Sequence, residues 1–314
     1  MGARIEAASS LTSHGLRKAT ARRLADEAAK ACLGHAGKQP GDIDMLINTG
    51  IYREDNMGEP ALAALIQEDI GANLGQPPIG GHGTFSFDLM NGSCGVVSAI
   101  RLQAGFLRSG VIRSGLIVAS DVNPNPKDSG APPFQPSGGA MVLGWDESIA
   151  GFTDFHTETF PEYEGMHESH YYWKAARGPH GPGRPIGHSQ LVIDEKPGYQ
   201  ARSVDCAVEA TRRFLGRVGM RIDEVDLLIP APSSADFLDR LRVRLGVPGD
   251  RVAYVEESLV SAFTVAPLAA VEAAIKSGRL GEARNTLMLA AGAGITVALA
   301  LYRQTPPGEP PVAS

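Results

Sequence analysis

Cysteine is scarce in this sequence of 314 residues. Only Cys32, Cys94 and Cys206 are present, far apart and without a CxxC pair. An odd, widely spaced set of cysteines argues against a disulfide framework and is typical of a reducing cytoplasm. No HExxH motif occurs, and the spacing of His167 and His170 alone is too loose to indicate a metal site. We therefore expect no metal, and ordinary surface or lid histidines at these two positions.

Positive charge does not dominate either. The 29 Lys and Arg residues are outnumbered by 35 Asp and Glu, which gives a formal net charge of −6. Because a nucleic-acid partner requires a basic face, we expect none. An uncharged apolar run at residues 286–302 is shorter than the about 20 residues that span a membrane, and a Gly-Ala-Gly sequence interrupts it. It predicts two buried strands joined by a glycine loop.

Targeting and nucleotide-binding signals are missing as well. Residues 1–13 lack the basic-then-apolar pattern of a signal peptide, so we expect a cytoplasmic protein without membrane segments. No GxGxxG or GxxxxGK[ST] loop is present, which sets a nucleotide-binding α/β protein aside. The composition, 43% hydrophobic and 20% charged, is typical of a globular enzyme. The length allows two domains or one large layered α/β unit.

Residues 85–121 organise the rest of the chain. They begin with a short apolar strand and reach a corner of small residues, NGSCG, at 91–95. Residues 96–107 predict a helix that is apolar on nearly every side and therefore buried, and residues 115–120 predict a buried strand. Backbone N–H groups at such a helix N-terminus favour an anion, so a nucleophile could lie there. Alternatively, Ser93 is only a helix cap and Cys94 only a buried small residue.

The second half of the chain repeats the order of the first. The sequence LADEAAKACLGHAG, ending at Gly37, matches CAVEATRRFLGRVG, ending at Gly219, and similar apolar strands follow both. A match at nearly fixed offset indicates two related βαβ-rich halves, the second with its buried helix at residues 261–275.

The two repeated halves suggest a division of the chain. We predict an N-terminal half at residues 1–153, opening with a short lead-in at 1–18, and a C-terminal half at 196–303. Residues 154–195 are rich in histidine and aromatic residues and predict a lid or interface insertion, because loops of this length usually carry function. The tail at 304–314 is predicted to be disordered.

The organising stretch resembles the thiolase superfamily, most closely the type III ketoacyl-ACP synthases. The family's nucleophile stretch, Phe-Asp-x-x-Ala-Ala-Cys-Ser-Gly-Phe, lies over FDLMNGSCGV at residues 87–96 without a gap. The strand at 134–145, the second central helix at 261–280 and the glycine turn near residue 292 also match, so the resemblance covers roughly residues 20–303. It implies an α/β, thiolase-like fold with duplicated halves in a layered α-β-α-β-α arrangement.

The resemblance also places the family's catalytic residues. The nucleophilic cysteine falls on Ser93, with Cys94 one position later; the histidine falls on Ala231, and the asparagine on Val260 or, allowing a slip, Ser261. In the family, histidine and asparagine donate hydrogen bonds to a developing enolate, which alanine and valine cannot do. Losing one such donor costs roughly a hundred-fold or more in rate. Standard decarboxylative condensation is therefore not expected.

Three interpretations remain open. In the first, Ser93 is the acyl-accepting nucleophile, activated by a base for which His156 and His167 are the candidates. In the second, Cys94 is the nucleophile, its thiol pKa lowered by the helix N-terminus, which requires a one-residue shift that turns the helix by about 100°. In the third, the chain is a non-catalytic partner of an active paralogue, or an acyl-chain binder.

Acyl transfer also needs an oxyanion hole and a donor. The nucleophile's own N–H is one candidate, and the turn from Gly292 to Gly294 is another, because glycine lets the backbone approach the substrate. The resemblance implies an acyl thioester of coenzyme A or of an acyl carrier protein as substrate, with no other cofactor. A docking arginine of the family falls on Asp236, which favours coenzyme A. A dimer, with a second copy or with a thiolase-fold paralogue, is also implied.

Overall fold

The computed structural model describes residues 2–13, 19–75, 83–125, 135–147, 150–175, 187–231, 234–254 and 262–304. Its main feature is a nine-stranded sheet in the order β3-β2-β4-β5-β1-β6-β11-β10-β9. The strands are β1 (Gly2–Thr12), β2 (Met45–Asn48), β3 (Phe85–Asp88), β4 (Ser114–Asp121), β5 (Ser137–Asp146), β6 (Gly151–Thr159), β9 (Leu227–Ala231), β10 (Asn285–Gly292) and β11 (Thr296–Arg303). The helices are α1 (Ala21–Ala36), α2 (Leu62–Ile70), α3 (Gly95–Arg108), α4 (Tyr199–Arg217), α5 (Ala235–Leu245), α7 (Ala266–Lys276) and α8 (Arg279–Glu282).

Each half contributes the same pattern to the sheet. In the first half, β2 is parallel to β3 and β4, whereas β4, β5 and β1 are antiparallel. In the second, β9 is parallel to β10, whereas β10, β11 and β6 are antiparallel. Val252 forms a parallel bridge to Leu228 of β9, in the place that β3 takes beside β2. The predicted duplication is confirmed.

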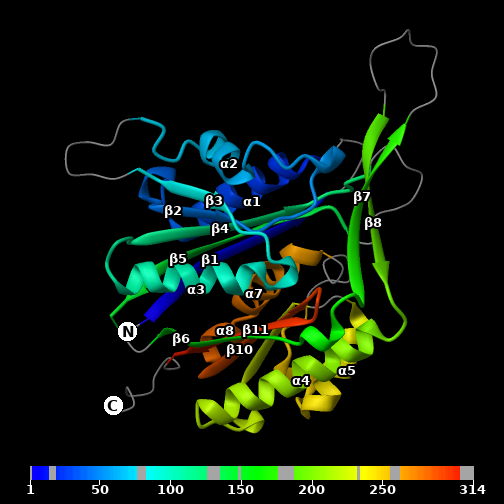
Figure 1. The fold of residues 1–314 in the computed structure, drawn as a ribbon. Helices are drawn as coiled ribbons and strands as arrows, with labels where there is room; N and C mark the ends of the chain where they lie inside the picture. The colour runs from blue at the N-terminus through cyan, green and yellow to red at the C-terminus, as the bar shows by residue number, and fades with distance from the viewer. Residues whose placement is uncertain are drawn as a thin grey trace.

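The helices and strands form five layers (Figure 1). Helix α1 packs on β1, β4 and β5, next to α2, and α4 packs on β10 and β11, next to α5. Between the two groups of strands lie α3, which contacts β1, β4, β10 and β11, and α7, which contacts β1, β5 and β9. The apolar faces of α3 and α7 meet in one continuous core. The layered α-β-α-β-α arrangement is therefore confirmed.

Local sequence signals set the ends of several elements. The hydroxyl of Thr20 caps α1 by accepting a hydrogen bond from the N–H of Arg23, and Gly37 ends that helix with a φ of 64°. The apolar run near the C-terminus forms β10 and β11, paired antiparallel around a turn that contains Gly294. Both features agree with the sequence prediction.

One predicted segment is wrong. The supposed lead-in at residues 1–18 contains β1, which lies inside the sheet between β5 and β6. Its sequence, GARIEAASSLT, has few of the β-branched and aromatic residues that indicate a strand. Small residues fit there because α1 and α7 both pack against β1. In addition, the predicted boundary after residue 153 falls within β6, which pairs with β11 of the second half.

The segment between the halves contains a β-hairpin. Strands β7 (His167–Ala175) and β8 (Gly187–Glu195) pair with each other in a separate two-stranded sheet at one edge of the layers (Figure 1). Residues 305–314 of the predicted tail lie outside the described residues. In the part of the chain that the structure describes, no helix has the length and apolar character to cross a membrane.

Candidate active site

The predicted corner is a short 3-10 turn, η3 (Gly92–Cys94), that leads directly into α3. Gly92 has a φ of 50°, a conformation that favours glycine. Gly95 begins the helix where a β-carbon would lie 3.1 Å from Cβ of Thr49, so glycine lets the helix end press against the end of β2. The backbone thus places Ser93 and Cys94 at the N-terminus of the buried helix.

A cavity of about 340 Å³ opens at this corner. Ser93 lines it, together with Tyr52 from the first half, Phe263 and Gly292 from the second, and side chains of the hairpin. The rings of Tyr52 and Phe263 are 5.1 Å apart and form part of the wall. The cavity therefore lies where the two halves and the hairpin meet.

The two nucleophile candidates have different surroundings. Ser93 is 6% exposed and lines the cavity, whereas Cys94 has no exposed surface. The sulfur of Cys94 lies 3.3 Å from the carbonyl oxygen of Thr296 and 3.7 Å from that of Ala290. Burial raises the pKa of the Cys94 thiol to about 12. At neutral pH the thiol stays protonated, and it points into the β10–β11 core, so its nucleophilicity is low.

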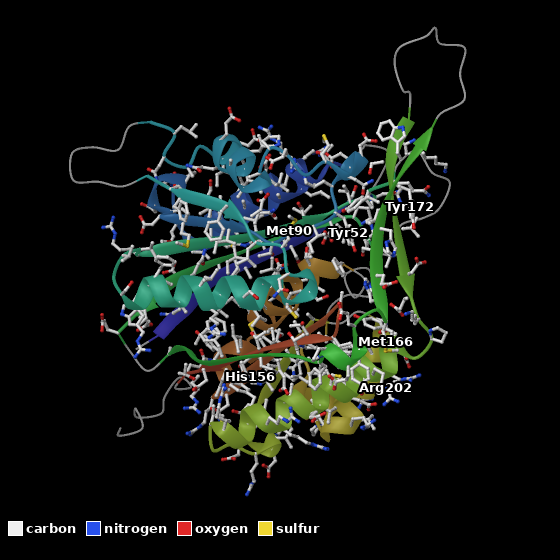
Figure 2. The ribbon with its side chains drawn as sticks, in the orientation of Figure 1. Tyr52, Met90, His156, Met166, Tyr172 and Arg202 are labelled. Carbon is white, nitrogen blue, oxygen red and sulfur yellow. The ribbon has the colours of Figure 1, made fainter. Side chains whose placement is uncertain are left out.

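The two histidine candidates are also separated. His167, on β7, lines the cavity, and its ring lies 5.2 Å from the ring of Tyr199. His156, on β6, stacks on Phe214 of α4 and has ring nitrogens 3.2 Å from Glu158 and Arg217. In Figure 2 His156 lies between β6 and α4, away from Tyr52 and the hairpin. The structure brings His167, and not His156, to the cavity of Ser93.

The positions of the family's other catalytic residues provide no donor among the described residues. Ala231 ends β9, is 2% exposed and pairs with Ala290 in the sheet. Val260 and Ser261 lie outside the described residues.

The glycine turn adjoins the nucleophile corner. A β-carbon built on Gly292 would lie 3.8 Å from the backbone nitrogen of Ser93 and 3.5 Å from the Cys94 sulfur. Gly292 and Ala293 line the cavity. Gly294 has a φ of 66° in the same turn and is not among the lining residues. The turn therefore packs directly on the corner, and it is Gly294, with its positive φ, that the turn requires as glycine.

Asp121, at the end of β4, holds the cavity wall together. Its buried carboxylate accepts hydrogen bonds from the N–H groups of Ile51 and Tyr52, at 3.1 and 2.8 Å, and from the N–H and hydroxyl of Thr264. Burial raises the pKa of this carboxyl, and the four donors oppose that shift. One side chain therefore connects the Tyr52 segment of the first half to the Phe263 turn of the second.

Sequence reasoning missed most of the cavity lining. Tyr52, Tyr171, Tyr199 and Glu195 come from four separate segments and belong to no motif. Burial raises the pKa of the Tyr52 phenol, and that of Tyr199 to about 12, so both stay uncharged at neutral pH. Within the described residues, no group of three or more His, Cys, Asp or Glu side chains could hold a metal ion.

Comparison with known proteins finds relatives along most of the chain and a family model that matches its C-terminal half. A family model described as 3-oxoacyl-[acyl-carrier-protein (ACP)] synthase III C terminal matches residues 215–304. Beta-ketoacyl-[acyl-carrier-protein] synthase III of Mesorhizobium japonicum is 24% identical over 289 residues, covering 90% of this chain and 84% of that protein. The protein of the same description from Thermosynechococcus vestitus is 27% identical over 290 residues, covering 89% and 82%.

Solved structures agree on the fold. The 3-oxoacyl-[acyl-carrier-protein] synthase III of Aquifex aeolicus superposes with a TM-score of 0.75 at 19% identity, covering 96% of this chain and all of that one, 100%. A variant of Xanthomonas campestris OleA superposes with a TM-score of 0.78 at 13% identity, covering 97% of each chain.

Proposed function

The chain is a 3-oxoacyl-ACP synthase III-like protein with the fold of the thiolase superfamily, and on that premise we propose that it is an acyltransferase acting through an acyl-enzyme at Ser93. The observation that carries this proposal is the shared cavity of Ser93 and His167. A serine nucleophile needs a neighbouring base, and the hairpin supplies one that the altered family position at Ala231 does not. Cys94, buried and protonated, is the weaker candidate.

The reaction proceeds in two balanced steps. His167 takes the proton from the Ser93 hydroxyl as its oxygen attacks the thioester carbonyl, and the imidazolium then protonates the leaving thiolate. The Gly292–Ala293 turn lies beside the Ser93 N–H at the cavity, and we propose that backbone N–H groups there stabilise the oxyanion. In the second step an acceptor hydroxyl, amine or thiol gives its proton to His167 and attacks the acyl ester. His167 then returns the proton to the Ser93 oxygen as the acyl group leaves on the acceptor.

Standard decarboxylative condensation is not part of the proposal. That reaction stabilises an enolate with hydrogen-bond donors, and the buried methyl of Ala231 offers none. Ser93, His167 and the glycine turn suffice for simple acyl transfer.

We propose a coenzyme A thioester as the donor. The relatives are named beta-ketoacyl-[acyl-carrier-protein] synthases. A cysteine-to-serine variant of OleA, which has the same fold, has been crystallised with lauric acid and lauroyl-CoA, which supports a coenzyme A thioester. An acidic carrier protein would need a basic patch, and the arginines of α5 pair instead with local carboxylates. Arg240 lies 2.9 Å from Asp236, and Arg244 lies 2.8 Å from Asp205. A salt-bridged helix face attracts an acidic partner weakly.

A dimer is also proposed. Strand β3 is at the edge of the sheet. Two large apolar side chains at this edge are exposed, Phe85 in the strand at 61% and Met90 just after it at 64%. An exposed apolar edge strand favours pairing with a second chain. We propose that a second copy of this chain pairs there.

The test is intact-mass measurement after incubation with a panel of acyl-CoA thioesters. We expect an acyl adduct on the native protein and on Cys94→Ala, none on Ser93→Ala, and formation slowed about a hundred-fold or more in His167→Ala. His156→Asn is the matched control and should react at the native rate. An adduct lost only in Cys94→Ala would support the thiol instead. No adduct with any donor, together with co-purification of a paralogue, would support a non-catalytic partner subunit.

A further inference from the structure

We propose that Glu195 is a positioning residue for His167, so that Ser93, His167 and Glu195 act as one unit. The inference rests on the proposed function, since it concerns the base that activates Ser93. Glu195 belongs to no sequence motif, and only the pairing of the hairpin strands places it.

The register of the hairpin places the two residues across from each other. His167 of β7 is directly opposite Glu195 of β8. Residues directly opposite in an antiparallel pair have β-carbons about 4.5–5.5 Å apart on the same face. Both residues line the cavity, as do Ser169 and Tyr171 at alternate positions of β7, so the face of the hairpin that carries them is the one turned toward Ser93.

The opposite face of the hairpin carries a pair of residues that are both acidic. Glu168 and Asp194 are directly opposite each other, one position along from His167 and Glu195, and neither lines the cavity. The carboxylate of Glu168 lies 3.7 Å from His170 on that outer face. The hairpin therefore contains a matched acidic control one residue away from the proposed one.

The first turn of α4 holds both members of the proposed pair. The amide nitrogen of Gln200 donates to the two carboxylate oxygens of Glu195, each at 3.2 Å. The ring of the preceding residue, Tyr199, packs 5.2 Å from the His167 ring. Two consecutive residues of one helix thus restrain the carboxylate and the imidazole.

A contact between the Glu195 carboxylate and the His167 ring would supply what a serine nucleophile needs. A carboxylate that accepts one imidazole N–H fixes the tautomer in which the other nitrogen can take the Ser93 proton. The imidazolium that forms is stabilised by the carboxylate, which itself stays ionised. The proton passes from Ser93 to His167 and on to the departing thiolate.

Glu195 is the one carboxylate among the described residues that line the cavity with His167. The remaining titratable groups that line the cavity are the phenols of Tyr52, Tyr171 and Tyr199. Burial raises the pKa of Tyr52 and Tyr199, so both remain neutral. Lys196 follows Glu195 in the chain, but its ammonium lies on the side of Gly165, whose β-carbon would be 3.6 Å away. The Glu195 carboxylate is thus the charge best placed to affect the imidazole.

The test compares Glu195→Gln with Glu168→Gln. We expect Glu195→Gln to slow formation of the Ser93 adduct about a hundred-fold, whereas Glu168→Gln reacts at the native rate. Because the carboxylate acts on the chemical step, its loss should lower kcat and leave KM nearly unchanged. Glu195→Asp keeps the charge and should restore part of the rate.

A second measurement does not depend on activity. The ring-nitrogen chemical shifts of His167, identified by their absence in His167→Gln, report its tautomer and should change in Glu195→Gln but not in Glu168→Gln. Unchanged ring shifts in Glu195→Gln would overturn the inference even if Ser93 is acylated. If no adduct forms on native protein, the proposed function fails, while the NMR comparison still decides whether Glu195 acts on His167.

Discussion

The corner of the first half, η3 (Gly92–Cys94), and that of the second, η7 (Phe263–Val265), have the same backbone and different side chains. Each is a 3-10 turn that leads into a central buried helix. The first residue of each has a positive φ, 50° at Gly92 and 46° at Phe263. The middle residues both carry a hydroxyl, but Ser93 lines the cavity, whereas Thr264 binds the buried carboxylate of Asp121.

This difference separates what the fold needs from what the chemistry needs. Both halves require the corner, because it turns the chain into the core helix. Only the first half presents its hydroxyl to the cavity. The second half uses its hydroxyl to hold Asp121, which also binds the N–H of Tyr52 in the cavity wall. We propose that the first corner reacts, whereas the second supports the site.

Removing the first hydroxyl should have the largest effect on function. We expect Ser93→Ala to abolish the acyl adduct and to change the free energy of unfolding by less than about 1 kcal/mol, since one small, nearly buried hydroxyl is lost. Mass spectrometry and chemical denaturation measure the two effects. A Ser93→Ala protein that is acylated as fast as the native protein would remove the distinction between the corners.

Removing the hydroxyl of Thr264 should lower stability and leave the acyl adduct intact. Thr264→Val keeps the side-chain shape but takes a donor from the fully buried Asp121 carboxylate, so we expect the free energy of unfolding to fall by about 1–3 kcal/mol. The folded variant should still form the Ser93 adduct. Denaturant titration checks the first expectation, and a native-like stability would show that Thr264 is not a structural anchor.

The outer helices offer a further contrast between the halves. In the repeat, Asp26 of α1 corresponds to Val208 of α4. Burial, and then the neighbouring Asp69, raise the pKa of Asp26 to about 8. The folded chain therefore binds this proton more tightly than the unfolded chain, and stability falls as the pH rises from about 4 to about 8.

Replacing Asp26 by the uncharged asparagine should remove that loss. Above about pH 8 we expect Asp26→Asn to be more stable than the native protein by on the order of 1 kcal/mol, a figure discounted because the carboxyl is only half-buried. Unfolding measured across the pH range tests the sign. A variant whose stability shows the native pH dependence would contradict it.

The smallest expected effect concerns the first residue of the corner. A β-carbon on Gly92 would meet no atom within 4 Å, so Gly92→Ala should cost only the strain of a positive φ, about 1 kcal/mol. Phe263 at the equivalent position shows that the turn accepts a side chain. Thermal unfolding of the variant checks the magnitude, and a failure to fold would show that the two corners are not equivalent.

Sequence reasoning predicts the elements with strong apolar signals. The helix after Ser93, the strand at β4 and the hairpin of β10 and β11 all occur where their patterns place them. β1 could not be predicted, because its residues are small, to leave room for the helices α1 and α7 that pack against it, and small residues have low strand propensity. The hairpin at β7 and β8 could not either, because its cavity face carries polar residues such as His167, Ser169 and Glu195, so no apolar–polar alternation marks the two strands.

For the site, the sequence identifies the corner at residues 91–95 but does not show which side chains surround it. The spacing alone cannot separate Ser93 from Cys94, because one residue turns the side chain from the cavity into the core. Nor can it select His167 over His156, since that choice depends on which strand faces Ser93. Glu195 becomes visible only through strand register.

The most direct test of the central claim is the chemical nature of the acyl bond on the native protein. After reaction with an acyl-CoA, peptide mapping with and without neutral hydroxylamine distinguishes an oxygen ester from a thioester, with Ser93→Cys as the thioester standard. We predict an adduct on Ser93 that withstands hydroxylamine, whereas the Ser93→Cys adduct is released. A hydroxylamine-sensitive adduct on Cys94 of the native protein would contradict the account.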